Sequence, residues 1–285
     1  MTAASSPRFA GLVWAAALAL CALVAAPASA QLVLPRPSHG AKVSATVGVT
    51  EVSVDYSAPG VKGRKVFGEL LPFGKVWRAG ANQATKITFS TDVSLGGKKV
   101  PAGSYSIFMI PTPTAWTVIL NQDTNASEQT YKTESDLLRV QAMPQAIPAR
   151  ERLAYEILDA TDGGATLALE WDKVRVAVPF TVDTQPLVLA SIKAIKGEDW
   201  RPYNAGARWL LENKLDTAQA LVLADKSIAL KEEWQNQWTR AELLAAKGDK
   251  PGALVAATKA QELGNKNPNG FFFADRVAKA LTDWK

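Results

Sequence analysis

Residues 174–182 read Val-Arg-Val-Ala-Val-Pro-Phe-Thr-Val, with an apolar side chain at every second position. This spacing places one face of a β-strand in a core and leaves the other face in water. The same alternation recurs from about residue 42 onward, and glycine-rich joints at 96–97, 101–103 and 162–164 favour antiparallel hairpins between the runs. The pattern predicts an antiparallel β-sandwich domain over residues 42–184, built from about eight or nine short strands.

After Pro186 the apolar spacing changes to three and four and the alanine content rises, which predicts helices to the end of the chain. This part repeats itself at an offset of 33 residues, since 210–211 matches 243–244 and 220–222 matches 253–255. A pair of helices is therefore duplicated. The last helix, which carries Trp284, is expected to cap the array.

Small side chains at Ala253, Ala257 and Ala260 resemble the second helix of a tetratricopeptide repeat, where they let two helices approach closely. The match is degenerate, because the aromatic positions of the first helix are missing and Ala241 stands at the inter-helix glycine position. The sequence thus predicts a mainly β plus α protein, whose small all-α, tetratricopeptide-like helical-repeat domain covers residues 185–285.

The first thirty residues have the order of a secretory signal peptide: Arg8, an apolar run over 11–26, and small residues at 28–30. Cleavage is expected after Ala30, followed by a flexible leading segment over 31–41. The run is shorter than the roughly 20 residues of a membrane span, so no transmembrane anchor is expected after cleavage. A signal anchor and lipid attachment at Cys21 are the alternatives. The mature protein is predicted to be periplasmic or secreted.

Cleavage removes Cys21, the only cysteine, and with it any disulfide, thiolate metal site or thiol nucleophile. The formal net charge is +5, of which Arg8 contributes one, and no block of like charge stands out. Nucleic acid is therefore not an expected partner.

Several kinds of catalytic centre are excluded by the residues present. His39 is the only histidine, so the chain alone offers no Ser-His-Asp relay and no multi-histidine metal centre. Phosphate-loop and GxSxG motifs are missing. Residues 123–134 space oxygen-bearing side chains like a calcium loop, but Glu128 occupies the position of the obligatory glycine, which favours a polar hairpin. We expect no metal, no cofactor and no catalytic residue.

One family resemblance covers the β region as far as about residue 183. It is carried by Val-Asp-Tyr-Ser-Ala-Pro at 54–59, Gly-Arg-Lys-Val-Phe-Gly-Glu-Leu-Leu-Pro-Phe-Gly at 63–74, Val-Trp-Arg-Ala-Gly-Ala-Asn-Gln-Ala-Thr at 76–85 and Val-Pro-Ala-Gly-Ser-Tyr-Ser-Ile-Phe at 100–108. These motifs resemble domain-of-unknown-function family 2911. The resemblance implies a bacterial exported protein, commonly from Gram-negative species, and brings no established activity, cofactor or catalytic residue.

The Gly-rich loop over residues 59–82 is the candidate ligand site, because its polar and planar side chains can converge on a carboxylate, phosphate or sugar. The alternative is that these groups stabilise their own loop, whose backbone must be satisfied. The candidate ligand-binding residues, in the loop and in the strand that leads into it, are Asp55, Tyr56, Arg64, Trp77, Arg78 and Asn82.

The leading hypothesis is a non-enzymatic exported protein that binds an envelope ligand through this loop and a protein partner through its helical repeats. The residues identify neither the ligand nor the partner. One alternative is a carboxylate-dependent envelope hydrolase that uses a pair from Glu51, Asp55 and Glu69. Another is a purely structural module.

Overall fold

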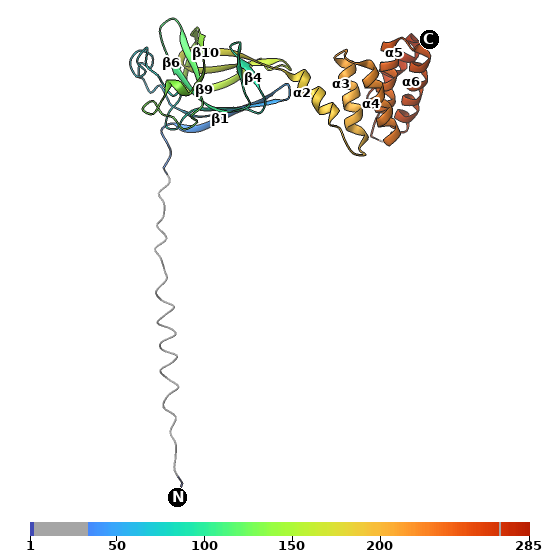
Figure 1. Ribbon diagram of the computed structural model, residues 1–285, viewed down its shortest axis with the longest axis horizontal. Helices are drawn as coiled ribbons and strands as arrows, with labels where there is room; N and C mark the ends of the chain where they lie inside the picture. Colours follow the sequence, from blue (N-terminus) through green and yellow to red (C-terminus); the bar gives the residue numbers. More distant parts are fainter. Residues whose placement is uncertain (3–33, 268) are drawn as a thin grey trace.

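The computed structural model describes residues 1–2, 34–267 and 269–285. In this part of the chain, two antiparallel β-sheets are followed by six α-helices, which confirms the predicted fold class (Figure 1). The apolar run and cleavage site of the predicted signal peptide lie outside the described residues, as do residues 31–33 of the leading segment. The signal peptide, its cleavage after Ala30 and the flexibility of residues 31–33 therefore stay predictions.

Each sheet is antiparallel throughout. The larger sheet has the order β1 (His39–Val47), β2 (Thr50–Ala58), β3 (Lys86–Phe89), β6 (Gly103–Ile110), β7 (Trp116–Asn121) and β8 (Asp136–Ala142). The smaller sheet has the order β5 (Lys98–Val100), β4 (Val93–Leu95), β10 (Gly164–Val182) and β9 (Gln145–Leu158). A short 3-10 helix, Thr133–Ser135, precedes β8.

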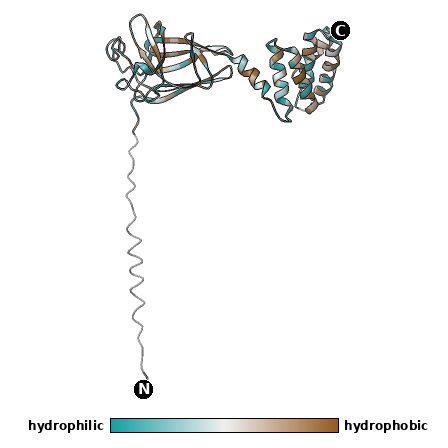
Figure 2. Cartoon of the chain, viewed as in Figure 1, coloured by the Kyte–Doolittle hydropathy of each residue, from teal (hydrophilic) through white to brown (hydrophobic). Residues whose placement is uncertain are grey.

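The main core lies between the two sheets and takes the inward residue of each alternation. Trp116 from the larger sheet and Trp171 from the smaller sheet are 2% and 1% exposed, as their positions in the sequence predict. The ring of Phe67 meets both edge-on, at centroid distances of 5.0 and 6.1 Å. Part of the Gly-rich loop therefore closes one end of the core. Apolar and polar residues alternate along the strands in Figure 2.

The sandwich begins earlier than the predicted boundary at residue 42, because β1 starts at His39 and pairs with β2 over its whole length, from His39–Ala58 to Val47–Thr50. Residues 39–41, predicted to belong to the flexible leading segment, are therefore strand. The alternation of apolar and polar side chains is weak there, because Gly40 stands at an outward position and has no polar side chain. His39 is exposed at the start of the strand.

The helical part contains two similar helix pairs followed by a shorter helix, as the 33-residue offset predicts. The helices are α2 (Thr184–Lys193), α3 (Trp200–Glu212), α4 (Thr217–Leu230), α5 (Trp234–Lys247), α6 (Lys250–Asn265) and α7 (Ala274–Asp283). In Figure 1, α2 connects the sandwich to the remaining helices. The offset superimposes α3 and α4 on α5 and α6. It also superimposes the N-caps of the second helix of each pair, Asp216 before α4 and Asp249 before α6.

The small residues of α6 do what their size predicts. Ala253, Ala257 and Ala260 are fully buried in a cluster that also contains Trp238 of α5. At the C-terminal end, Trp284 stacks on Trp238 with ring centroids 5.8 Å apart. The last helix thus covers apolar surface that the second pair would otherwise expose.

None of the helices within the described residues is both long enough and apolar enough to span a bilayer.

Candidate functional site

Arg64, in the first half of the Gly-rich loop, is bonded to the loop itself. Its guanidinium donates to the carbonyl oxygens of Gly60 at 2.6 Å and Val61 at 2.9 Å. Nearby, the backbone N–H of Lys62 donates to Glu151 Oε1 at 3.0 Å, which ties the same turn to β9. The loop thus uses this arginine to satisfy backbone oxygens that a strand ladder does not reach.

Arg78, in the second half of the loop, is paired with Glu128 and donates to the carbonyl oxygen of Asn82. The backbone N–H of Arg78 also donates to Glu128 Oε1 at 3.2 Å. Burial raises the pKa of Glu128, but hydrogen bonds and charge from Arg78 outweigh it and hold the pKa below its ordinary value. Glu128 is therefore a carboxylate at neutral pH and neutralises Arg78.

Trp77 and Asn82 are also held by internal contacts. Trp77 is 5% exposed, its ring stacks on Trp171 at 5.9 Å, and its indole N–H donates to the carbonyl oxygen of Gly80 at 3.0 Å. Asn82 donates from Nδ2 to the carbonyl oxygen of Ser38 at 3.0 Å. Trp77 is thus a core residue, and Asn82 fixes the chain just before β1.

A cavity of about 420 Å³ brings together four of the six predicted residues: Arg64, Trp77, Arg78 and Asn82. We call it the loop cavity. Trp171 also lines it, and its Nε1 has no hydrogen-bond partner among the described residues. The convergence that the sequence predicts is present, but the four side chains already donate their hydrogen bonds to the protein.

The other two predicted residues, Asp55 and Tyr56, are neighbours on β2 and point to opposite faces of the sheet. Tyr56 follows the inward alternation and its ring contacts Tyr155 edge-on at 5.1 Å, so it packs against the core. Asp55 points outward and pairs with Lys42 at 3.3 Å. Asp55 therefore belongs to a second surface, on the outer face of the larger sheet, whose lining also includes Tyr56.

This second surface is a cavity of about 770 Å³, which we call the outer-sheet cavity. Lys42, Asp55 and Lys86 line it from β1, β2 and β3, and they stand in one transverse row because Lys42 pairs with Asp55 and Asp55 with Lys86 in the strand register. Arg36 joins them from the segment before β1. Three cationic side chains and one carboxylate therefore line this cavity, and Lys86 Nζ donates to Asn125 Oδ1 at 3.5 Å.

Small residues make the floor of the outer-sheet cavity. Gly40 of β1 pairs with Ser57 of β2, next to the charged row, and Ala84 lines the cavity just before β3. A Cβ added at Gly40 would meet no heavy atom within 4 Å. The hollow thus follows from short side chains at outward positions between long ones. Lys42 and Lys86 are not among the predicted site residues, although their outward alternation, together with that of Asp55, is visible in the sequence.

The chain before β1 lies between the two cavities. Two of its carbonyl oxygens accept hydrogen bonds: Pro37 O from Arg152 Nη1 of β9 at 2.7 Å, and Ser38 O from Asn82 Nδ2 of the Gly-rich loop at 3.0 Å. Pro37 and Ser38 line the loop cavity, whereas Arg36 lines the outer-sheet cavity. The contacts of Asn82 and Arg152 thus hold Arg36 in place.

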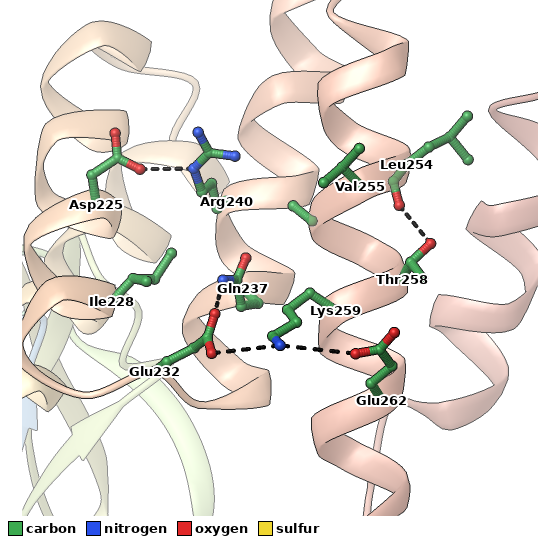
Figure 3. Close-up of a pocket in the computed structure, with 11 residues that line it drawn as sticks. Asp225, Ile228, Glu232, Gln237, Arg240, Leu254, Val255, Thr258, Lys259 and Glu262 are labelled. Atoms are coloured by element: carbon green, nitrogen blue, oxygen red, sulfur yellow. Dashed lines mark hydrogen bonds and ion pairs between the residues drawn. The ribbon is translucent and has the colours of Figure 1, made fainter.

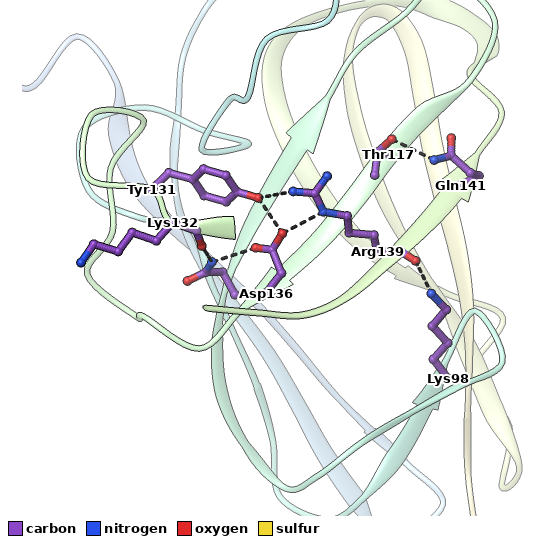
Figure 4. Close-up of polar contacts among 8 residues, drawn as sticks. Lys98, Thr117, Tyr131, Lys132, Asp136, Arg139 and Gln141 are labelled. Carbon is purple, nitrogen blue, oxygen red and sulfur yellow. Dashed lines mark hydrogen bonds and ion pairs between the residues drawn. The ribbon is translucent and has the colours of Figure 1, made fainter. Parts of the chain in front are cut away.

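The segment between β7 and β8 forms the remaining wall. Figure 4 shows how it is anchored: Asp136 accepts from the Tyr131 hydroxyl at 2.6 Å and from Arg139 Nε at 2.8 Å. Burial and the neighbouring Asp136 carboxylate raise the pKa of Tyr131, so its hydroxyl keeps its proton and continues to donate. The anchored segment brings Thr124 and Asn125 to the outer-sheet cavity.

The carboxylates of the calcium-like and hydrolase alternatives have partners within the protein. Among the described residues, no group of three or more His, Cys, Asp or Glu side chains is placed to hold a metal ion, and Asp123 Oδ1 accepts from the backbone N–H of Asn125 at 3.0 Å. The carboxylates of the hydrolase alternative have separate partners: Asp55 binds Lys42, Glu69 binds Lys65 and Glu51 accepts from Thr46. Glu51 and Asp55 lie four positions apart on one strand, about 13 Å, beyond the spacing of a glycosidase pair.

The helical part has a hollow of its own between α4, α5 and α6, of about 680 Å³. Figure 3 shows its two ion-pair groups: Arg240 binds Asp225, and Lys259 lies between Glu232 and Glu262. Val255 lies beside them and is 71% exposed. Opposite charges alternate across this surface, so it has no strong preference for one sign of ligand.

Fold and surfaces together define a two-sheet sandwich domain, hollowed on the outer face of its larger sheet and continued by paired helices. Residues 38–180 match the family model described as "Protein of unknown function (DUF2911)", and the chain belongs to this family. The matched range covers the strands that build both cavities, and it ends within β10, before the helices. No curated protein and no solved structure shows significant similarity to the chain.

Proposed function

We propose that this protein is a non-enzymatic binding protein, exported to the periplasm or beyond, whose sandwich domain binds a small anionic ligand in the outer-sheet cavity. The observation that carries the proposal is the in-register row of Lys42, Asp55 and Lys86, with Arg36 beside it. Three cations against one carboxylate leave a surplus of positive charge in a hollow. An anion that binds there gains charge-assisted hydrogen bonds.

The sequence supports the proposed location through the order of its first thirty residues, which is that of a secretory signal peptide. The separate partners of Glu51, Asp55 and Glu69 support binding over hydrolysis. In this proposal the Gly-rich loop supports the site: it closes the core and, through Asn82, fixes the chain that carries Arg36.

The test is a thermal-shift screen of residues 31–285 against phosphate, sulfate, carboxylates, sugar acids and neutral sugars. An anion present at about 100 times its Kd stabilises the native state by about 2.7 kcal/mol, which for a domain of this size raises Tm by roughly 5–10 °C. Lys42→Gln and Lys86→Gln are expected to abolish the shift. The matched control is Lys173→Gln, an exposed lysine of β10 in the other sheet. No shift with any anion, or equal loss in all three variants, would refute the proposal.

A second proposed activity is that the helical part contacts a protein partner. The observation that favours it is that Val222 and Val255, equivalent positions of the two helix pairs, are 68% and 71% exposed. Two exposed apolar side chains one repeat apart form the kind of surface that stacked helix pairs offer to proteins. A Val222→Ser, Val255→Ser double variant should lose capture of that partner from an envelope extract while retaining anion binding.

A further inference from the structure

The polar residues that surround the charged row indicate which anions fit the outer-sheet cavity. Ser57, Gln83, Thr124 and Asn125 all line it, and each has a neutral side chain that both donates and accepts hydrogen bonds. Such groups match hydroxyls, which also donate and accept. Tyr56 is also in the lining, but its ring packs against the core, and the apolar side chains there are the small ones of Ala41 and Ala84. They offer little surface to an acyl chain.

The size of the outer-sheet cavity also favours a ligand larger than a simple inorganic anion. About 770 Å³ lies within the range of roughly 300–1,000 Å³ that is usual for small-molecule sites. A lone inorganic phosphate or acetate, only a few times the roughly 30 Å³ share of one water, would leave most of this space to solvent. The neutral wall would then stay without a ligand partner.

From these observations we infer that the ligand is a polyhydroxylated anion, either a sugar acid or a sugar phosphate. Its charged group lies against Lys42 and Lys86, and its hydroxyls are shared between the Asp55 carboxylate and the amides of Gln83 and Asn125. Asp55 has a role here that a site for a bare anion would not give it, because a carboxylate accepts hydrogen bonds from sugar hydroxyls. The inference rests on the proposed function and narrows it to one chemical class.

The experiment is isothermal titration of residues 31–285 with five probes: D-glucuronate, glucose 6-phosphate, glucose, acetate and inorganic phosphate. Glucuronate or glucose 6-phosphate is expected to bind at least about 10-fold more tightly than the other three, the factor that corresponds to about 1.4 kcal/mol. Whichever of the two binds more tightly identifies the charged group as carboxylate or phosphate.

Two kinds of variant separate charge from hydroxyl recognition. Gln83→Ala and Asn125→Ala should weaken the hydroxylated probe by about 10-fold and leave inorganic phosphate unchanged, whereas Lys86→Gln should weaken both. Gly40→Phe should block every probe, because the added side chain enters open space in the hollow. An aromatic residue suits an edge strand, and circular dichroism checks that the variant folds.

The possible failures are distinguishable. Binding of inorganic phosphate or acetate as tight as that of the sugar derivatives, unaffected by Gln83→Ala and Asn125→Ala, would overturn the inference and leave the proposed anion site standing. No binding of any charged probe would overturn both. Tight binding of glucose itself would also contradict the inference, because the cationic row would then have no part in recognition.

Discussion

Glu170, which is 5% exposed, is the one buried charged residue among the described residues, and its neutralisation is the sharpest test of the packing of the smaller sheet. Glu170 Oε1 accepts from Arg175 Nε at 2.6 Å, and its second oxygen binds Arg150. Glu170→Gln keeps the shape and removes the charge. Breaking a fully buried pair costs about 3–5 kcal/mol, and hydrogen bonds to charged groups are worth about 1.5–3 kcal/mol.

The lower of these ranges applies, because the side chains of Arg150 and Arg175 are 37% and 34% exposed and water can solvate them once Glu170 is neutral. We expect a loss of about 2 kcal/mol, or a fall in Tm of roughly 4–8 °C. The control is Glu156→Gln, which removes a 31% exposed carboxylate from the same Arg150. A partly exposed pair of this kind should cost only about 0.5 kcal/mol.

The pH dependence of this effect has a definite sign. Burial raises the pKa of Glu170, but hydrogen bonds and charge from Arg175 and Arg150 outweigh it, so the folded-state pKa lies below the ordinary value of 4.5. A lowered carboxyl pKa stabilises the fold above that ordinary value, and the contribution is lost as the pH falls through the folded-state pKa. Calorimetry should therefore show that Glu170→Gln is less stable than wild type at pH 7 and that this difference in stability disappears in acid. Equal losses in Glu170→Gln and Glu156→Gln, or a difference unchanged in acid, would refute the reasoning.

Three further predictions concern the other charged and turn positions. Burial, only partly offset by two arginines, raises the pKa of Glu242 above its ordinary value of 4.5. Urea titrations should therefore show wild type losing stability relative to Glu242→Gln as the pH rises above that ordinary value, the opposite sign to Glu170. Gly248 ends α5 with a φ of 88°, and Gly248→Ala should cost about 1 kcal/mol in the same assay, whereas Gly163→Ala, with no such φ and open space around it, should be near neutral. Arg78→Ala leaves Glu128 without its ion-pair partner and should lower Tm by several degrees while the Kd for the anion stays within about 2-fold of wild type; a large change in Kd would restore the Gly-rich loop as the ligand site.

The fold was predictable because its pattern is redundant along the chain. Val176, Val178 and Phe180 repeat on β10 the same period of two that Val52 and Val54 show on β2, and all five are buried. An error at one position does not change the assignment of a domain whose other strands carry the same signal. The helix pairs were predictable for the same reason, since two copies of one pattern support each other.

The candidate site was only partly predictable, because it depends on register between strands. Residues 42, 55 and 86 are separated by 13 and 31 positions, and only the pairing of β1, β2 and β3 makes them one row. A shift of one residue in that pairing would move each side chain to the other face. In the Gly-rich loop, by contrast, arginines and a tryptophan lie close together along the chain, and this is why the loop is the predicted site.

The contrast between the two cavities has a common physical cause. Backbone groups in a strand are satisfied by the ladder, whereas those in a long irregular loop must find side-chain partners. Arg64 and Asn82 donate to backbone carbonyls for this reason, and Arg78 donates to the carbonyl of residue 82 as well as pairing with Glu128. Lys42 and Lys86 stand on strands whose backbone needs no such help, so their partners are side chains of the cavity itself, Asp55 at 3.3 Å and Asn125 at 3.5 Å. A dense group of polar residues in a loop is therefore weaker support for a binding site than the same residue types in register on the outer face of a sheet.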